Sequence, residues 1–170
     1  MGTEDGTIIL MEYFSVWEWK KQEIVFFAGV VLVILVISAV QLRTGAMKTR
    51  DAQRKADAEL VTRALVRYLG DYRILPADDN GAIISCGREG MERCDWGEGE
   101  IVDRDNVVYL KKLPVDPKVS EGRRYVYEAD DKRQTFKIFV ALEYRRDPAY
   151  KKGLTQACGS NIQCNWYAGN

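Results

Sequence analysis

The longest apolar segment of the chain lies near its N-terminus. Ile24 to Leu42 runs for 19 residues without a charged side chain, between Glu23 and Arg43. As an α-helix this segment would be about 28 Å long, which is close to the thickness of the hydrocarbon core of a bilayer. A domain of this size could hardly surround a helix that is apolar on every side. The pattern therefore predicts a transmembrane helix.

A cleaved signal peptide is the alternative for this segment. Its apolar region would follow a positively charged region and would end near Ala39. Residues 1–23 instead carry five acidic side chains against Lys20 and Lys21, which is the wrong sign for such a region. We therefore expect the helix to stay as a membrane anchor. The chain then divides into an N-terminal extension at 1–22, a transmembrane segment at 23–42 and a head at 43–170.

The helical pattern continues beyond the apolar segment. No proline occurs between Arg43 and Pro76, and apolar residues recur at spacings of three and four while charged residues mostly take the other side. The apolar positions are Leu60, Val61, Ala64, Leu65, Tyr68, Leu69 and Tyr72. This part of the helix is amphipathic, so something must cover its apolar face. From Ile24 to Tyr72 the helix would have 49 residues and a length of about 73 Å.

Alternating apolar and polar residues in the C-terminal half predict β-strands. Thr135 to Glu143 (TFKIFVALE) places its apolar side chains on one face, and Arg124 to Ala129 (RYVYEA) precedes it. The polar segment Asp130 to Gln134 joins them, so we expect an antiparallel hairpin. Asn106 to Leu110 is expected to be a third, edge strand, and Ala77 to Glu100 a long connecting loop. The predicted fold class is α+β, with the amphipathic helix packed on a small antiparallel sheet.

Charge and composition narrow the possible functions. The chain has 25 basic and 25 acidic side chains and no histidine. A net charge of zero argues against nucleic acid as a partner, and the lack of histidine removes the usual catalytic triads and histidine-ligated zinc. Asp103, Asp105 and Asn106 could bind Ca²⁺, but their spacing is not that of an EF-hand, and a solvated acidic turn is expected. We therefore expect no catalytic residue, no cofactor and no metal site.

Four cysteines lie in two short-range pairs within loop-like sequence. Their spacing favours disulfides between Cys86 and Cys94 and between Cys158 and Cys164, which suits an oxidising compartment. A zinc site and free thiols remain as alternatives. The tail from Leu154 to Asn170 is expected to cover the sheet.

The distribution of basic residues points to the opposite compartment from the cysteines. Two basic residues precede the apolar segment and five follow soon after it. By the positive-inside rule alone, this would place the head in the cytoplasm.

Three further segments resemble one protein family. They are Arg50 to Asp57 (RDAQRKAD), Tyr68 to Pro76 (YLGDYRILP) and Tyr109 to Pro117 (YLKKLPVDP). In this order after an apolar N-terminal helix, the chain resembles the type IV pilins and the pseudopilins of type II secretion, most closely the major pseudopilin, over about Glu23 to Glu143. The resemblance implies a single-pass protein of the cytoplasmic (inner) membrane, with its N-terminus inside and its head extracytoplasmic. Its partners would be membrane lipid, other copies and other pilin-like subunits.

The N-terminal end of the apolar segment departs from the family pattern. Glu23 stands where the family has an acid inside the apolar run, but Glu18 stands where the glycine of the processing site is expected. Without processing, residues 1–22 would remain as a cytoplasmic extension. Glu23 is the candidate assembly residue, and the alternative is that it merely ends the apolar run at the level of the lipid headgroups.

Two functions from different classes are compatible with this sequence. The first is a structural, non-enzymatic subunit of a type II secretion or type IV pilus-like apparatus, which assembles into a filament through its N-terminal helix. The second is a monomeric, membrane-tethered extracytoplasmic module that binds a ligand with its long loop and its tail.

Overall fold

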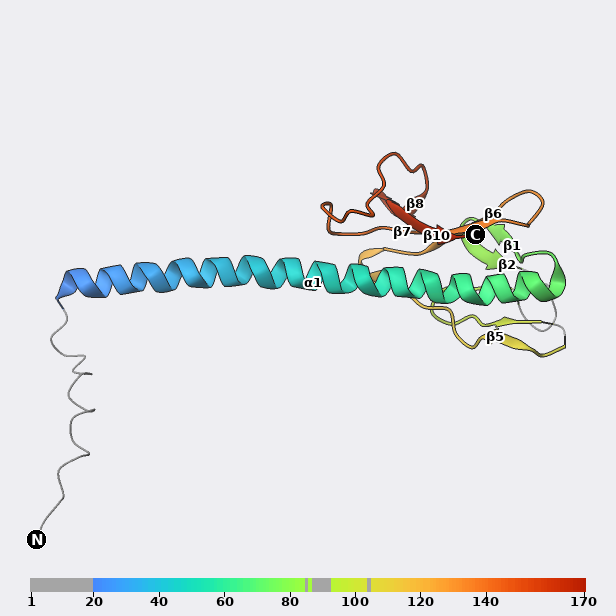
Figure 1. Cartoon of the computed structure of the whole chain (residues 1–170), viewed down its shortest axis with the longest axis horizontal. Coiled ribbons are helices and arrows are strands. Elements are labelled where there is room, and N and C mark those ends of the chain that lie inside the picture. The colour runs from blue at the N-terminus through green and yellow to red at the C-terminus, as the bar shows by residue number, and fades with distance from the viewer. Residues whose placement is uncertain (1–19, 85, 87–92, 104) are drawn as a thin grey trace, which may run out of the picture. The chain divides into compact units, whose positions relative to one another are not determined.

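The computed structural model describes residues 20–84, 86, 93–103 and 105–170 (Figure 1). The chain divides into two compact units after Arg43, and helix α1 (Lys21–Tyr72) contributes to both. In the first unit every residue from Ile24 to Leu42 is exposed. Among the described residues, α1 is the one helix that is long and apolar enough to cross a membrane. The expected apolar helix near the N-terminus is therefore present, and its side chains are not buried by the protein.

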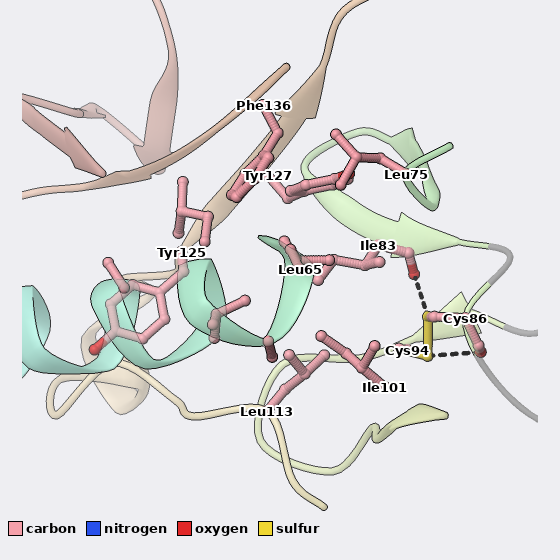
Figure 2. Close-up of a cluster of buried hydrophobic side chains, with 14 of the residues drawn as sticks. Leu65, Leu75, Ile83, Cys86, Cys94, Ile101, Leu113, Tyr125, Tyr127 and Phe136 are labelled. Carbon is pink, nitrogen blue, oxygen red and sulfur yellow. Dashed lines mark hydrogen bonds between the residues drawn. A yellow bond between two sulfur atoms is a disulfide. The ribbon is translucent and has the colours of Figure 1, made fainter. Parts of the chain in front are cut away.

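The second unit, Thr44–Asn170, is built around the rest of α1. Val61 and Leu65 are fully buried, as the spacing of three and four residues predicts, whereas Leu60 is 40% exposed. The buried helix face contacts apolar side chains from several strands and loops (Figure 2). These partners include Leu75, Ile83, Ile101, Leu113, Tyr127 and Phe136. One main core thus forms between α1 and the rest of the unit.

Three antiparallel strands form the largest part of this covering layer. They are β6 (Val126–Ala129), β7 (Phe136–Val140) and β10 (Trp166–Gly169), in the order β10-β7-β6. The side chains of β7 alternate, so that Phe136 and Ile138 join the core around α1 while Phe139 joins a second cluster. The expected hairpin of β6 and β7 is confirmed by their register.

The expectation for Asn106 to Leu110 is wrong in its pairing. β5 (Val108–Leu110) pairs with β4 (Ile101–Val102) in a separate two-stranded sheet, and β10 is the third strand of the main sheet. The turn at Asp103 explains the difference, because its carboxylate accepts hydrogen bonds from the backbone N–H groups of Asp105 and Val107, both at 2.8 Å. This turn folds β5 back onto the segment directly before it.

The segment from Ala77 to Glu100 was expected to be a loop, but its described residues form three short strands. β1 (Ala77–Asp79), β2 (Ala82–Ile84) and β3 (Arg93–Cys94) form an antiparallel sheet in the order β1-β2-β3. Asn80 and Gly81 make the turn between β1 and β2, with φ angles of 49° and 83°. Positive φ at both central residues is the requirement of a type I′ hairpin turn, and asparagine followed by glycine favours it.

The C-terminal tail covers the second face of the main sheet. β8 (Ala157–Gly159) and β9 (Ile162–Gln163) form a hairpin that the Cys158–Cys164 disulfide closes. Both sulfurs pack in the second cluster, with Val126, Phe139 and Ala141. The main sheet therefore lies between α1 and the tail. The other disulfide joins Cys86 to Cys94, and a short 3-10 helix, η2 (Val119–Glu121), precedes β6.

Removal of the tail disulfide should destabilise the second unit. The double substitution Cys158→Ala/Cys164→Ala releases a loop whose ends are six residues apart in sequence, and the loss of this constraint on the unfolded chain costs about 2 kcal/mol. We expect the free energy of unfolding of the full-length chain, measured with urea in mild detergent, to fall by that amount. The same variant should show no further loss when the solution is made reducing, except for the contribution of Cys86–Cys94. An unchanged urea midpoint would show that the tail covers the sheet without help from the disulfide.

Candidate functional site

The buried face of α1 begins with charged residues instead of apolar ones. Asp51 is 2% exposed and Arg54 is fully buried. With Ala58, Val61 and Leu65 they follow one stripe at spacings of three and four residues, so the same helix face is ionic at one end and apolar at the other. A buried charge is very costly without partners, so the surroundings of Arg54 decide whether this arrangement is stable.

The Arg54 guanidinium is held by three carboxylates from three segments of the chain. Its Nε and Nη2 donate to the two oxygens of Asp116, at 2.8 and 2.9 Å, in the bidentate geometry that suits arginine. Its Nη1 donates to Asp51 Oδ1 at 2.8 Å and to Glu143 Oε1 at 2.7 Å. Asp116 lies between Pro114 and η2, and Glu143 follows β7. Arg54 thus ties two distant loops to α1.

The carboxylates are in turn held by other groups. Glu143 also binds a second arginine, this time in bidentate geometry. Arg50 Nε and Nη2 donate to its two oxygens at 2.8 and 2.6 Å. Asp51 accepts the backbone N–H groups of Glu143 and Tyr144, the latter at 2.8 Å. Asp116 Oδ1 accepts the backbone N–H of Lys118 at 2.8 Å. We call Arg50, Asp51, Arg54, Asp116 and Glu143 the charge cluster.

The charge cluster holds two cations and three anions. Lys118 lies beside it, with its Nζ 3.8 Å from Glu143 Oε2 and 2.8 Å from Glu121 Oε1. Hydrogen bonding from Arg50, opposed by burial and reinforced by Arg54, lowers the pKa of Glu143 to about 2. Burial alone would lower the pKa of Arg54, but its hydrogen bonds to Asp116, Glu143 and Asp51 raise it above the ordinary value. Glu143 and Arg54 therefore both stay ionised near neutral pH.

The chemistry of the charge cluster is that of a structural joint. Arginine stays protonated throughout the physiological range, and each of the three carboxylates accepts hydrogen bonds from a guanidinium. None of its five residues is a nucleophile with an adjacent base, which acyl transfer by a side chain would need. What the geometry does is fix two loops, at Asp116 and Glu143, against one turn of α1.

The candidate residues predicted from the sequence lie elsewhere. Glu23 is exposed in the first turn of α1, in the other unit of the chain. The four cysteines form the two short-range disulfides of the fold. Within the described residues, no three His, Cys, Asp or Glu side chains are placed to hold a metal ion.

The acidic turn at Asp103 differs from its expected solvated form. Asp103 is only 4% exposed. The single hydroxyl proton of Tyr109 is shared between two carboxylates, Asp71 at 2.7 Å and Asp103 at 3.1 Å. Asp103 therefore has protein partners on both oxygens, and it joins the turn to the end of α1.

Arg54 and Asp116 lie in two of the segments that resemble the pilin family, but neither residue was assigned a role from the sequence. Two signals could have identified them. Asp51 and Arg54 continue the apolar stripe of the helix, so that burying the stripe must bury them too. Asp116 follows the buried Leu113 in a segment that two prolines keep out of regular strand pairing, which leaves its carboxylate available to the helix.

No family model matches the chain, and no curated protein or solved structure is significantly similar to it. The resemblance to pilins thus stays a prediction from three sequence segments. The exposed apolar helix and the contacts within the second unit are the structural observations that bear on function.

Replacement of Arg54 should destabilise the second unit strongly. Arg54→Met keeps most of the side-chain volume but leaves the buried Asp51 and Asp116, and the part-buried Glu143, without their common cation. A change of this type costs about 3–5 kcal/mol. The matched control is Arg63→Met, at an exposed position of the same helix, where a change within about 0.5 kcal/mol is expected. Urea unfolding of the full-length chain in mild detergent measures both. Equal stabilities of the two variants would contradict the role given to Arg54.

Acid should weaken the charge cluster through Glu143. Because the pKa of Glu143 is depressed to about 2 in the folded state, its contribution is complete above its ordinary value near 4.5 and is lost as the pH falls towards 2. Burial raises the pKa of Asp57 despite its hydrogen bond from Tyr125, so Asp57 acts in the opposite sense. The contribution of Glu143 is therefore measured as the difference in the pH dependence of the unfolding free energy between the wild type and a variant that lacks this carboxylate.

The variant Glu143→Gln should reveal this contribution. Between pH 5 and 2 the wild type should lose about 2–3 kcal/mol more unfolding free energy than Glu143→Gln, which lacks the titrating group. Glu121→Gln, at an exposed acid that contacts Lys118, should keep the wild-type pH profile. Parallel profiles for wild type and Glu143→Gln would exclude Glu143 as the source of the acid sensitivity.

Proposed function

We propose that this protein is a membrane-anchored, pilin-like structural subunit of a type II secretion or type IV pilus-like apparatus. The observation that carries the proposal is the apolar part of α1. From Ile24 to Leu42 every side chain is exposed, including Phe26, Leu32 and Ile37. Such a helix needs lipid or other apolar helices around it, and lateral packing of copies in a membrane satisfies the same need in a filament.

The contacts of the second unit support the family resemblance. The segments RDAQRKAD and YLKKLPVDP meet where Arg54 binds Asp116. The third segment, YLGDYRILP, ends α1 and contributes Leu75, which is 1% exposed, to the main core. The residues by which the chain resembles the family are therefore those that join the helix to the rest of the head. This is what a shared way of folding the head would require.

The ion pairs of the head also bear on the proposed orientation. Three of the five basic residues that follow the apolar segment have structural partners, since Arg50 and Arg54 bind the charge cluster and Lys55 binds Asp147 at 2.8 Å. Folding of the head therefore accounts for their presence, which weakens the positive-inside argument for a cytoplasmic head. The two disulfides favour an oxidising compartment. The proposed topology has the N-terminus inside and the head outside the cytoplasmic membrane.

In this proposal Glu23 is the assembly residue. It is exposed in the first turn of α1, directly before the apolar segment. A carboxylate at this depth can form a charged contact with a basic group of a neighbouring copy at the membrane interface, where such a contact is stronger than in water.

Disulfide cross-linking within the membrane tests assembly. Ile24 and Val33 are nine residues apart, which places them on opposite sides of a helix that turns about 100° per residue. In the double variant Ile24→Cys/Val33→Cys, head-to-tail packing of copies should give a ladder of dimers, trimers and larger species after mild oxidation of membranes. Each single variant should stop at dimers, because one cysteine forms one bond. Adding Glu23→Gln to the double variant should weaken the ladder.

A monomeric tethered module predicts a different result. It would give a faint dimer band that falls away as expression is lowered, with no ladder at any level. That outcome, or recovery of the chain in the soluble fraction after lysis, would contradict the proposed function.

A further inference from the structure

A second group of cations lies on the loop that follows β7. We define the basic loop as Tyr144–Gly153, which carries four exposed cations, Arg145, Arg146, Lys151 and Lys152. Its one acidic residue, Asp147, is held by Lys55. Among the ion pairs formed by the described residues, none involves these four cations. The basic loop thus differs from the charge cluster, where every charge has a partner.

The basic loop borders an open pocket of about 410 Å³. Arg145, Lys151 and Lys152 line it, together with Gln163 and Asn165. The amide of Asn165 is already used, because it accepts the backbone N–H of Leu142 at 2.7 Å and donates to the carbonyl of the same residue. The charge that remains at the pocket is therefore positive. A phosphate group suits this combination of one guanidinium and two ammonium groups.

The basic loop is bound to α1 at a point that lies close in sequence to the apolar segment. The backbone N–H of Tyr144 donates to Asp51 at 2.8 Å, and Lys48 Nζ lies 4.8 Å from the centre of the Tyr144 ring. Lys48 comes only six residues after Leu42, the last residue of the apolar segment. Six residues reach about 20 Å at full extension, whatever angle the two units adopt. If Leu42 is in lipid, Lys48 and the start of the basic loop are therefore within reach of the headgroups.

We propose that the basic loop binds the phosphate groups of anionic phospholipids and docks the head on the membrane surface. This inference rests on the membrane anchoring in the proposed function, and it adds a second lipid contact to that of α1. Basic residues next to a membrane that contains anionic lipid each strengthen binding by about fivefold. The tether makes the contact intramolecular, so that weak individual contacts are sufficient.

A lipid surface fits these observations better than a second copy of the chain. The tether leaves the basic loop within reach of the headgroups whether or not copies associate. An acidic surface on another copy would have to be brought to the loop by assembly. In a subunit that assembles in the membrane, lipid binding would keep the head on the membrane surface before the subunits pack together. This contact would be lost when the subunit leaves the bilayer.

The test uses nanodiscs that each hold one full-length chain. Hydrogen exchange of the peptide that covers 144–153 is compared in discs of phosphatidylcholine alone and in discs with roughly one third phosphatidylglycerol, a fraction that gives an anionic surface. We expect exchange in this peptide to slow by about fivefold or more in the anionic discs, and the effect to disappear in high salt, which screens the attraction. Peptides from β6 and β7 should exchange equally in both kinds of disc.

Matched charge variants identify the residues responsible. Arg145→Gln/Arg146→Gln/Lys152→Gln removes three cations of the basic loop and leaves Lys151, whose Nζ lies 3.6 Å from the centre of the Tyr167 ring. It should abolish the difference between the discs. The control Arg63→Gln/Arg67→Gln/Lys111→Gln removes three exposed cations elsewhere and should keep the difference.

The possible outcomes separate this inference from the proposed function. A chain that enters discs but exchanges equally in both lipids would overturn the docking and leave the anchoring intact. Protection that appears only when several copies share a disc, in neutral lipid as well, would identify another copy as the partner and would also overturn it. Failure of the chain to enter discs would overturn both proposals.

Discussion

The second unit depends on one buried guanidinium. Arg54 is fully enclosed, so it must be surrounded by acceptors before the head can close around α1. Three carboxylates meet this requirement, and they come from α1 itself, from the loop at Asp116 and from the chain after β7. Their geometry is directional, because a planar guanidinium donates to a bidentate carboxylate in only a few orientations. The positions of both loops relative to the helix therefore follow from one side chain.

Such a joint matters here because the sheets alone specify little. β7 has five residues and is the longest strand, and several others have only two or three. Short ladders with few hydrogen bonds allow shifts in register, and apolar packing tolerates changes of partner. A buried ion pair adds less net stability than its contacts suggest, but any arrangement that separates Arg54 from Asp116 leaves a charge unpaired. The charge cluster therefore acts mainly by excluding alternative arrangements of the loops.

The sequence revealed those features that depend on periodicity. The apolar run, the stripe through Val61 and Leu65, and the alternation in β7 each follow from neighbours a few residues apart, and each is present. Features that depend on one particular contact were missed. β10, for example, joins the main sheet only because the tail returns beside β7 and pairs with it. The Asn80–Gly81 turn is different, since it is a local signal that the polar segment around it conceals. Arg54 could not be assigned a role, because a charge on a helix is normally solvated and only the tertiary structure supplies its three partners.

The balanced net charge of the chain conceals two opposite uses of cations. In the charge cluster Arg54 is enclosed, Arg50 is part-buried, and both are paired with carboxylates, which fixes the fold. One residue beyond Tyr144, whose backbone N–H is bound to Asp51, the cations become exposed and lack acidic partners among the described residues. Because the two groups are adjacent in the chain, the charge cluster also positions the basic loop, by holding its first residue against α1. A substitution at Asp51 would therefore affect both groups. It would lower the stability of the charge cluster, and it would change the position of the exposed cations of the basic loop.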